Sequence, residues 1–543
     1  MGVRKSIFWH LFLLVMALPT LLALLGVVSA LLQPDASVLS HLLQYVLPSA
    51  VTNTIMLVLG VGLVTTLLGV GLAWLTSVCE FPLRGFFVWA LILPMAIPGY
   101  VMAFALVGTF EYTGPMQVFL RDVFGSSRWF PNIYSYGGVV MALSLALYPY
   151  TYMIVRNAFQ TQGRRSLEVG QSLGLSAWQS FWKVSLPMAR PWIAGGTLLV
   201  VMETLADFGT VATFNYDTLT SAIYKSWFGL YSLPAALQVA SVLLIFVVVI
   251  TLLERKSRAA QRFSQSRSKQ LAEHRMRLSK AHRWLALLFC TLVFTLGFVL
   301  PCVQLLWWAI PNIELELTGQ FWAYVFGSIT LALIAMTIIA GLAMLMAFAA
   351  RTHHSRFAKT AVRISTLGYA LPGTVLAVGL FAPIAAIDQW LGNTALLQPL
   401  FRDGLLQAPL LQGTMLVMML AYSVRFMAVA FTPLESNLLR ITPSIDAAAK
   451  SLGVSGVQML RKVHMPMIKG GLATAMILVF VDVMKELPIT LMTRPFGFNT
   501  LAVRIFELSS EGLWERAALP ALAIVLVGLA PAFMLIKRSE HDA

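Results

Sequence analysis

Long apolar stretches alternate with short polar ones along the chain of 543 residues. Twelve of these stretches reach about the 20 residues that a helix needs to cross a hydrocarbon core about 30 Å thick. We therefore expect an all-α polytopic membrane protein. The expected spans are 7–31, 52–76, 86–110, 137–158, 191–213, 235–253, 284–309, 324–350, 364–386, 412–432, 470–492 and 515–536.

The spans divide six and six around a polar, Ser/Arg/Gln-rich stretch. This division predicts a first six-helix repeat over 1–253, a basic cytoplasmic linker over 254–283 and a second six-helix repeat over 284–543. We interpret the linker as a solvated connector that also contacts anionic lipid.

The composition supports a membrane protein, because 58% of the residues are hydrophobic and only 11% are charged, against about 25% charged in soluble domains. The formal net charge is +15, which could indicate a nucleic-acid partner. Here Lys and Arg lie in short loops between apolar stretches, which is typical of membrane topology. We therefore expect membrane lipid and no nucleic acid as a partner.

The basic residues gather in alternate loops. The loops 156–190, 254–283 and 351–363 are rich in Lys and Arg, and so are the residues outside the first and last spans. The loops 32–51 and 310–323 contain neither residue type. Because loops rich in Lys and Arg stay in the cytoplasm, both termini are predicted to be cytoplasmic.

Three features recur in the same order in the two halves: a Ser-Leu-Gly triplet, a proline thirteen positions after its glycine, and a pair of acids four positions apart. The recurring positions, which all keep one constant offset, are Gly174 and Gly453, Pro187 and Pro466, Glu203 and Asp482, and Asp207 and Glu486. The repeats are parallel, which predicts a pseudo-twofold axis along the membrane normal. Pro98-Gly99 and Pro372-Gly373 fall inside the third span of each half and are expected to break or kink it.

The loop around each recurring glycine carries the most specific motif. In the first half, Glu168-Val169-Gly170 precedes Gly174, and Val184-Ser185-Leu186-Pro187 follows it. In the second half, Ala447-Ala448-Ala449 precedes Gly453, and Val463-His464-Met465-Pro466 follows it. We expect a short helix over 166–173 that stops at Gly174, since glycine favours helix ends, and a second helix that begins near Ser176.

These motifs resemble the EAA loop of binding-protein-dependent ABC importer permeases: Glu-Ala-Ala, three residues, Gly, nine residues, Ile-x-Leu-Pro. The spacing holds in both halves, but the glutamate position is Ala447 in the second half, with Asp446 one residue earlier. The resemblance implies a type I ABC importer permease fold. It also implies an ATPase-coupling role for Glu168, Gly174, Pro187, Ala447, Gly453 and Pro466.

The chain contains no Gly-x-x-x-x-Gly-Lys-Ser/Thr motif, the phosphate-binding loop of many ATPases. The resemblance therefore implies two separate ATPase subunits, as a homodimer, that hold ATP and Mg. This chain is expected to be a permease subunit, not an enzyme, with no cofactor of its own. A periplasmic solute-binding protein and a multi-pass location in a bacterial inner membrane are also implied.

Ionisable groups inside a span are costly, so each one is a functional hypothesis. Glu203 and Asp207, and likewise Asp482 and Glu486, are spaced i, i+4, so we expect each pair to share one helix face. The first acid lies about 24 Å along the axis from the preceding proline, at or past the midplane. The four acids are a candidate translocation path for a cation. The alternative is a set of paired structural charges that includes Lys485, and spacing alone defines no metal site.

The sequences around the acids are more specific to one family than the EAA-loop motifs are. Glu203-Thr204-Leu205-Ala206-Asp207-Phe208-Gly209-Thr210 and Asp482-Val483-Met484-Lys485-Glu486-Leu487-Pro488 resemble ferric-iron ABC permeases, in which the two halves are also fused. That resemblance implies import of Fe(III) from a periplasmic binding protein. Permeases for thiamine or a phosphonate share the architecture and remain the alternative. An ATP-independent secondary transporter would need no EAA loops.

Overall fold

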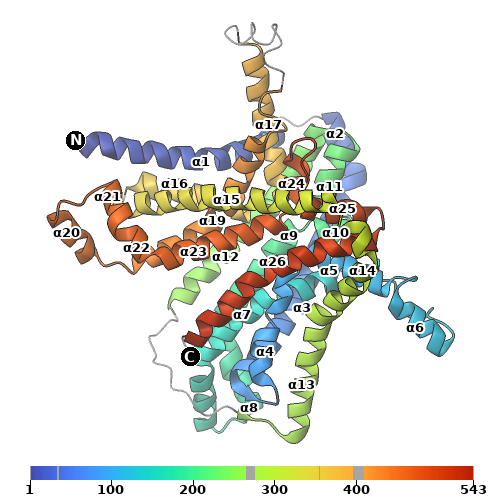
Figure 1. Cartoon of the computed structure of the whole chain (residues 1–543). Helices are drawn as coiled ribbons and strands as arrows, with labels where there is room; N and C mark the ends of the chain where they lie inside the picture. The colour runs from blue at the N-terminus through green and yellow to red at the C-terminus, as the bar shows by residue number, and fades with distance from the viewer. Residues whose placement is uncertain (1, 33–35, 264–275, 354, 395–408, 542–543) are drawn as a thin grey trace. The chain divides into compact units, whose positions relative to one another are not determined.

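A computed structural model describes residues 2–32, 36–263, 276–353, 355–394 and 409–541. Apart from turns and loops, the described chain is helical except for one pair of two-residue parallel strands, β1 (Cys79–Glu80) and β2 (Met276–Arg277). Helices are stable in lipid because a helix satisfies its backbone hydrogen bonds within itself. The predicted all-α class is therefore confirmed, and Figure 1 shows the helices coloured by their position along the chain. The middle of the expected linker, 264–275, lies outside the described residues.

The chain forms two compact units, and neither is a continuous half of the sequence. Unit 1 contains residues 1–43, 223–244 and 317–504, and unit 2 contains residues 44–222, 245–316 and 505–543. The elements of unit 1 are α1 (Gly2–Leu32), α2 (Ala36–His41), η4 (Lys225–Gly229), α15 (Gly319–Thr352), α16 (Arg356–Leu367), η6 (Gly368–Ala370), α17 (Gly373–Gly392), α19 (Met415–Leu439), α20 (Pro443–Ser451), α21 (Val457–Met459), η7 (Leu460–His464), α22 (Met465–Met467), α23 (Lys469–Lys485) and α24 (Pro488–Thr493).

Unit 2 holds most of the first half together with helices from the second. Besides β1 and β2, its elements are α3 (Leu47–Val78), α4 (Arg84–Ala90), η2 (Leu93–Ala96), α5 (Gly99–Phe110), α6 (Pro115–Phe124), α7 (Tyr136–Ser172), α8 (Ala177–Ser180), η3 (Phe181–Ser185), α9 (Leu186–Ala206), α10 (Gly209–Thr213), α13 (Lys280–Phe294), η5 (Thr295–Val299), α14 (Leu300–Glu316) and α26 (Trp514–His541). The chain passes from one unit to the other within η1 (Leu42–Val46), α11 (Leu219–Tyr224), α12 (Leu233–Phe263) and α25 (Leu501–Ser510), and between α14 and α15.

The first helix of the chain packs inside unit 1, against helices that come from the second half of the sequence. Glycines on α1 and α17 face one another there: a Cβ added to Gly26 would lie 2.2 Å from the carbonyl oxygen of Gly379. Small residues allow such close approach between helices in a membrane. The ranges 1–253 and 284–543 therefore describe repeats in the sequence, and that division stays a prediction.

Among the described residues, nine helices are long and apolar enough to cross a membrane, and eleven if two bent pairs each count as one span. The bent pairs correspond to the expected third and eleventh spans, and the expected span at 515–536 falls within α26. The chain is a multi-pass membrane protein. The number twelve and the pseudo-twofold axis stay predictions.

Both Pro-Gly pairs break their helices, as predicted. Helix α5 begins at Gly99 and α17 begins at Gly373, each directly after a proline with extended backbone. At the first break the segments Arg84–Ala96 and Gly99–Phe124 are bent by 95°. Proline cannot donate a backbone hydrogen bond and disfavours a helical conformation in the residue before it.

Candidate functional site: two loop segments and the intramembrane acids

The two loops predicted to couple to an ATPase are called here the first loop segment (residues 164–187, in unit 2) and the second loop segment (residues 443–466, in unit 1). Both turn at a glycine in the left-handed conformation, with φ of +76° at Gly174 and +77° at Gly453. The backbone N–H of Leu175 donates to the Gly170 oxygen, and that of Val454 to the Ala449 oxygen, each at 2.9 Å. These are the bonds of a Schellman motif, so the predicted helix stop at Gly174 is confirmed.

The segments differ before this turn. In the first loop segment α7 runs unbroken from Tyr136 to Ser172, so the prediction of a separate short helix over 166–173 is wrong. In the second loop segment α19 ends at Leu439, and the separate nine-residue helix α20 begins at Pro443. The cause is local: Thr442, before the proline, is extended with ψ 150°, as residues before proline tend to be. The first loop segment has no proline at this place.

After the turn, both segments have a short helix, a turn of π-helix and a proline, but only the first runs on as one span, Trp178–Ala206. In the second, Val457–Met467 and Lys469–Lys485 are bent by 82°. Ser176 caps α8, since its hydroxyl accepts from the Gln179 N–H while the Gln179 side chain accepts from the Ser176 N–H. This reciprocal capping box places the second helix where the sequence predicted it. One turn of π-helix follows in each segment, η3 in the first and η7 in the second. Pro187 and Pro466 then lie in the first turns of α9 and α22.

Close packing holds the first loop segment together. A Cβ added to Gly170 would lie 2.1 Å from the Ser180 hydroxyl, so α7 and α8 touch where only glycine fits. The ring of Phe181 packs on Trp74 of α3, with centroids 4.6 Å apart. Glu168 and Leu173 remain exposed. The family glutamate position thus presents its carboxylate on the outer surface of unit 2.

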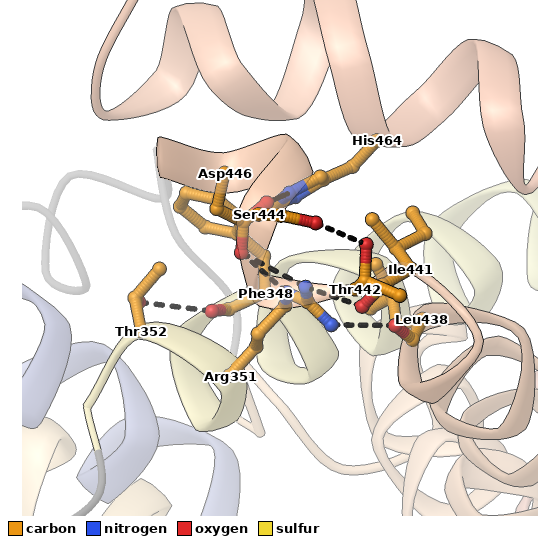
Figure 2. Close-up of polar contacts among 9 residues, drawn as sticks. All are labelled: Phe348, Arg351, Thr352, Leu438, Ile441, Thr442, Ser444, Asp446 and His464. Carbon is orange, nitrogen blue, oxygen red and sulfur yellow. Dashed lines mark hydrogen bonds and ion pairs between the residues drawn. The ribbon is translucent and has the colours of Figure 1, made fainter. Parts of the chain in front are cut away.

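The second loop segment is held instead by charge (Figure 2). Arg351, one residue before the end of α15, donates from Nε and Nη2 to Asp446 Oδ2, at 3.0 and 2.8 Å. His464 Nε2 lies 2.8 Å from Asp446 Oδ1 and is the donor in this pair, because an ionised carboxylate only accepts. Asp446 lies in the first turn of α20, where a negative charge is favourable.

The same arginine also closes the end of α19. Its Nη1 donates to the Leu438 carbonyl oxygen, and its Nη2 donates to the Ile441 oxygen at 2.9 Å. Carbonyls at a helix C-terminus lack partners within the helix, so a cation there stabilises it. One guanidinium therefore joins the ends of α15 and α19 to the start of α20.

The cluster of Arg351, Asp446 and His464 is largely shielded from solvent. The His464 side chain is 1% exposed, Arg351 15% and Asp446 23%, and the His464 ring packs on Phe348 of α15 with centroids 5.6 Å apart. Burial acts to raise the pKa of Asp446. Hydrogen bonds from His464 and Arg351, and then the Arg351 charge, outweigh it and hold that pKa below its usual value. Asp446 is therefore ionised at neutral pH and turned inward, whereas Ala447, at the glutamate position, is exposed.

The first intramembrane pair does not share a helix face as predicted. Helix α9 ends at Ala206, and Asp207 has extended backbone with ψ 130°. Its carboxylate accepts from the Thr210 hydroxyl at 2.8 Å and from the Val211 N–H at 3.1 Å, which caps α10. A Cβ on Gly99 would lie 3.2 Å from the same carboxylate, so the start of α5 packs directly on it.

The second pair repeats this arrangement in unit 1. Helix α23 ends at Lys485, and the Glu486 carboxylate accepts from the N–H groups of Ile489 and Thr490, each at 3.0 Å. A Cβ on Gly373 would lie 3.0 Å from it. In each unit, then, the second acid of the pair caps a short helix beside a Pro-Gly break. The shared-face prediction failed because a helix break separates the two members of each pair.

Glu203 and Asp482 stay on the last turns of α9 and α23, half-buried. Lys485 lies near enough to Asp482 for their charges to interact. Among the described residues, no three His, Cys, Asp or Glu side chains are grouped as a metal site requires. Each pair therefore offers one carboxylate committed to a helix cap and one that is half-buried.

Sequence reasoning missed Arg351 entirely, because its partner lies 95 positions later and no motif links the two. The start of α20 did have a signal in the sequence, since Thr442-Pro443 is an N-cap residue followed by proline. That signal predicts the separate helix of the second loop segment, but it says nothing of the arginine that binds it.

Comparison with known proteins agrees with these features. Residues 65–259 match the family described as binding-protein-dependent transport system inner membrane component. The chain is 26% identical over 492 residues, 90% of this chain and 89% of the relative, to an Fe(3+)-transport system permease protein of Haemophilus influenzae. A thiamine transport system permease protein of Haemophilus influenzae is 24% identical over 53% of this chain and 55% of its own length. A molybdenum transport system permease protein of Escherichia coli is 27% identical over 34% of this chain and 80% of its own length.

Proposed function

We infer that this chain, whose residues 65–259 match the binding-protein-dependent transport system inner membrane component family, is the membrane permease of an ATP-driven importer. The observation that carries the inference is the pair of loop segments. Each turns at a left-handed glycine within the same spacing of residues and is followed by a long helix, α9 directly in the first and α23 after a bend in the second. Such a turn is an exposed projection, with Leu173 and Leu452 on its surface, that a partner protein can bind.

The energy for transport comes, in this proposal, from two identical ATPase subunits, one on each loop segment, that bind ATP and Mg. A solute-binding protein delivers the solute from the periplasm. Both termini and both loop segments lie in the cytoplasm, as the distribution of Lys and Arg favours. The coupling residues are Glu168, Gly174, Pro187, Ala447, Gly453 and Pro466.

Ferric iron is the solute that we propose. The relative named for Fe(3+) transport aligns along 90% of this chain, against 53% for the thiamine permease. Glu203 and Asp482, half-buried near helix breaks, would favour a passing cation over an anion, since oxygen ligands suit hard cations. Asp207 and Glu486 would support this path by fixing the breaks beside it.

Uptake into proteoliposomes tests the proposal. The chain is reconstituted with its ATPase subunits and the co-purifying binding protein, and uptake of radioactive Fe(III) and of thiamine is measured with ATP or a non-hydrolysable analogue inside. We expect iron uptake that requires ATP hydrolysis. Thiamine uptake alone would replace the substrate, and uptake driven by an ion gradient without the ATPase would overturn the proposed function.

The role of the acids is tested in the same vesicles. Neutralising only Glu203 and Asp482, as Gln and Asn, should abolish iron uptake and leave assembly with the ATPase intact. Changing Asp207 and Glu486 to Ala should instead lower stability by about 0.5–2 kcal/mol each, because Ala removes the oxygens that cap α10 and α24. Iron uptake that survives the first pair of changes returns all four acids to a structural role.

A further inference from the structure

We propose that Arg351, Asp446 and His464 are positioning residues that lock the second loop segment to the end of α15, so that a movement imposed on α20 is passed to that membrane helix. The inference rests on the proposed function and adds the route by which force enters unit 1. It assigns Asp446 to the permease itself, not to a bond with the ATPase.

The need for such a lock follows from the break before α20. In unit 1 the helix before the segment, α19, stops at Leu439, and α20 starts only at Pro443. The short joint between them, which includes the extended Thr442, can bend, and a bend there would absorb a push on α20. In the first loop segment no joint exists, because α7 continues to Ser172 as one helix.

The lock crosses this joint on both sides. Arg351 binds the carbonyl of Leu438, before the joint, the carbonyl of Ile441 within it and the carboxylate of Asp446 beyond it. His464, the last residue of η7, also binds Asp446, so the lock includes the segment that leads through α22 into α23. A planar guanidinium with several donors fixes direction as well as distance, so these bonds set the angle of α20.

The first loop segment has no equivalent of the acid. At the repeat offset, Leu167 occupies the position that corresponds to Asp446, and Ser185 occupies the one that corresponds to His464. That segment relies on the unbroken α7, the Gly170–Ser180 contact and the aromatic packing of Phe181. The lock therefore occurs where the helix is interrupted and is replaced by other contacts where it is not.

The test measures coupling separately from assembly. Arg351→Ala and Asp446→Asn are compared with the wild type in proteoliposomes that contain the ATPase subunits and the Fe(III)-loaded binding protein. Arg356→Ala is the matched control, a nearby arginine that is exposed. We expect both cluster variants to keep the bound ATPase and its hydrolysis, while solute imported per ATP falls about three- to thirtyfold. The double variant should be no worse than either single one.

A distance measurement provides the second readout. Spin labels at Ala448→Cys on α20 and Thr337→Cys on α15, in a chain whose own cysteines are replaced, should give one narrow distance in the wild type and a broad distribution in Arg351→Ala. Unchanged import per ATP in both variants would overturn the proposal. Loss of ATPase binding in both would do so too, because the cluster would then only fold the segment. A wild type that imports no Fe(III) overturns the proposed substrate instead, and leaves the distance measurement to decide on the lock.

Discussion

The two loop segments share a turn and differ in how each is joined to its unit. In the first, the membrane helix itself extends to the turn, and side-chain packing at Gly170 and Trp74 secures it. In the second, a proline separates the helix from the projection, and an ion pair bridges the gap. The comparison teaches that the turn is the part both loops require, whereas stiffness is obtained in two different ways.

The largest effect is expected from Gly170→Ala. The added Cβ would lie 2.1 Å from the Ser180 hydroxyl and 3.3 Å from its Cα, so α7 and α8 must separate, at a cost of about 1–3 kcal/mol. The reverse change at the matching position, Ala449→Gly, should cost only about 0.5–1 kcal/mol. Titration of each solubilised variant with purified ATPase measures the difference. An equal loss of ATPase affinity in the two variants would show that the first loop segment does not depend on this contact.

The turn itself should be equally sensitive in both segments. Gly174→Val and Gly453→Val each force a β-branched residue into the left-handed region, which costs roughly 1–2 kcal/mol for an ordinary residue. Each variant is expected to uncouple ATP hydrolysis from uptake, as measured by solute imported per ATP. Gly470→Val is a control, because a Cβ there meets open space and no positive φ is required. Unimpaired uptake in either turn variant would remove that turn from the coupling machinery.

Joining α19 and α20 into one continuous helix tests whether the ion pair is needed because of the joint. Thr442→Ala combined with Pro443→Ala removes the proline and replaces the extended threonine before it by a strong helix former, and should let α19 continue into α20. In that background Arg351→Ala should reduce import per ATP only about twofold, a smaller coupling effect than in the wild-type joint. An undiminished effect of Arg351→Ala would mean that the ion pair serves something other than the joint.

The smallest effect concerns pH. The pKa of Asp446 is lower in the folded protein than its usual value, so its contribution to stability is complete above the unfolded pKa of about 3.9 and is lost as the pH falls through the folded pKa. The narrow distance between labels on α20 and α15 should therefore persist from about pH 7 to about pH 5 and broaden only below about pH 3.9. Broadening already at about pH 5 would contradict the lowered pKa.

Local rules predicted much of this molecule. Glycine at a helix end, a helix that begins near Ser176 and Pro-Gly breaks each depend on neighbouring residues alone, and the structure has all of them. The two wrong predictions concern where a helix ends: the separate helix over 166–173 and the shared helix face of each acidic pair. The sequence has no proline directly before Ser166 that would separate a short helix from α7. Pro488 disfavours a helical conformation in the residue before it, which is a signal that the helix holding Asp482 ends near Glu486.

Long-range packing could not be predicted. Arg351 and Asp446 are 95 positions apart, and the partners of α1 lie far along the chain. Nothing in the composition of α1 distinguishes a helix that packs with its own half from one that packs with the other. The packing of Gly99 against the Asp207 carboxylate also joins residues far apart in the sequence, although the cap that Asp207 makes is local.

The contact of Gly26 with Gly379 has a consequence for biosynthesis. The first helix leaves the ribosome long before its binding surface on α17 exists, since most of the chain between the two glycines must be made first. At about 5–20 residues per second, the nascent helix waits in the bilayer for on the order of tens of seconds before that partner is made. During this interval the face of α1 that holds Gly26 must be covered by lipid or by the insertion machinery. The helix therefore has to be stable in the bilayer before it can pack on α17.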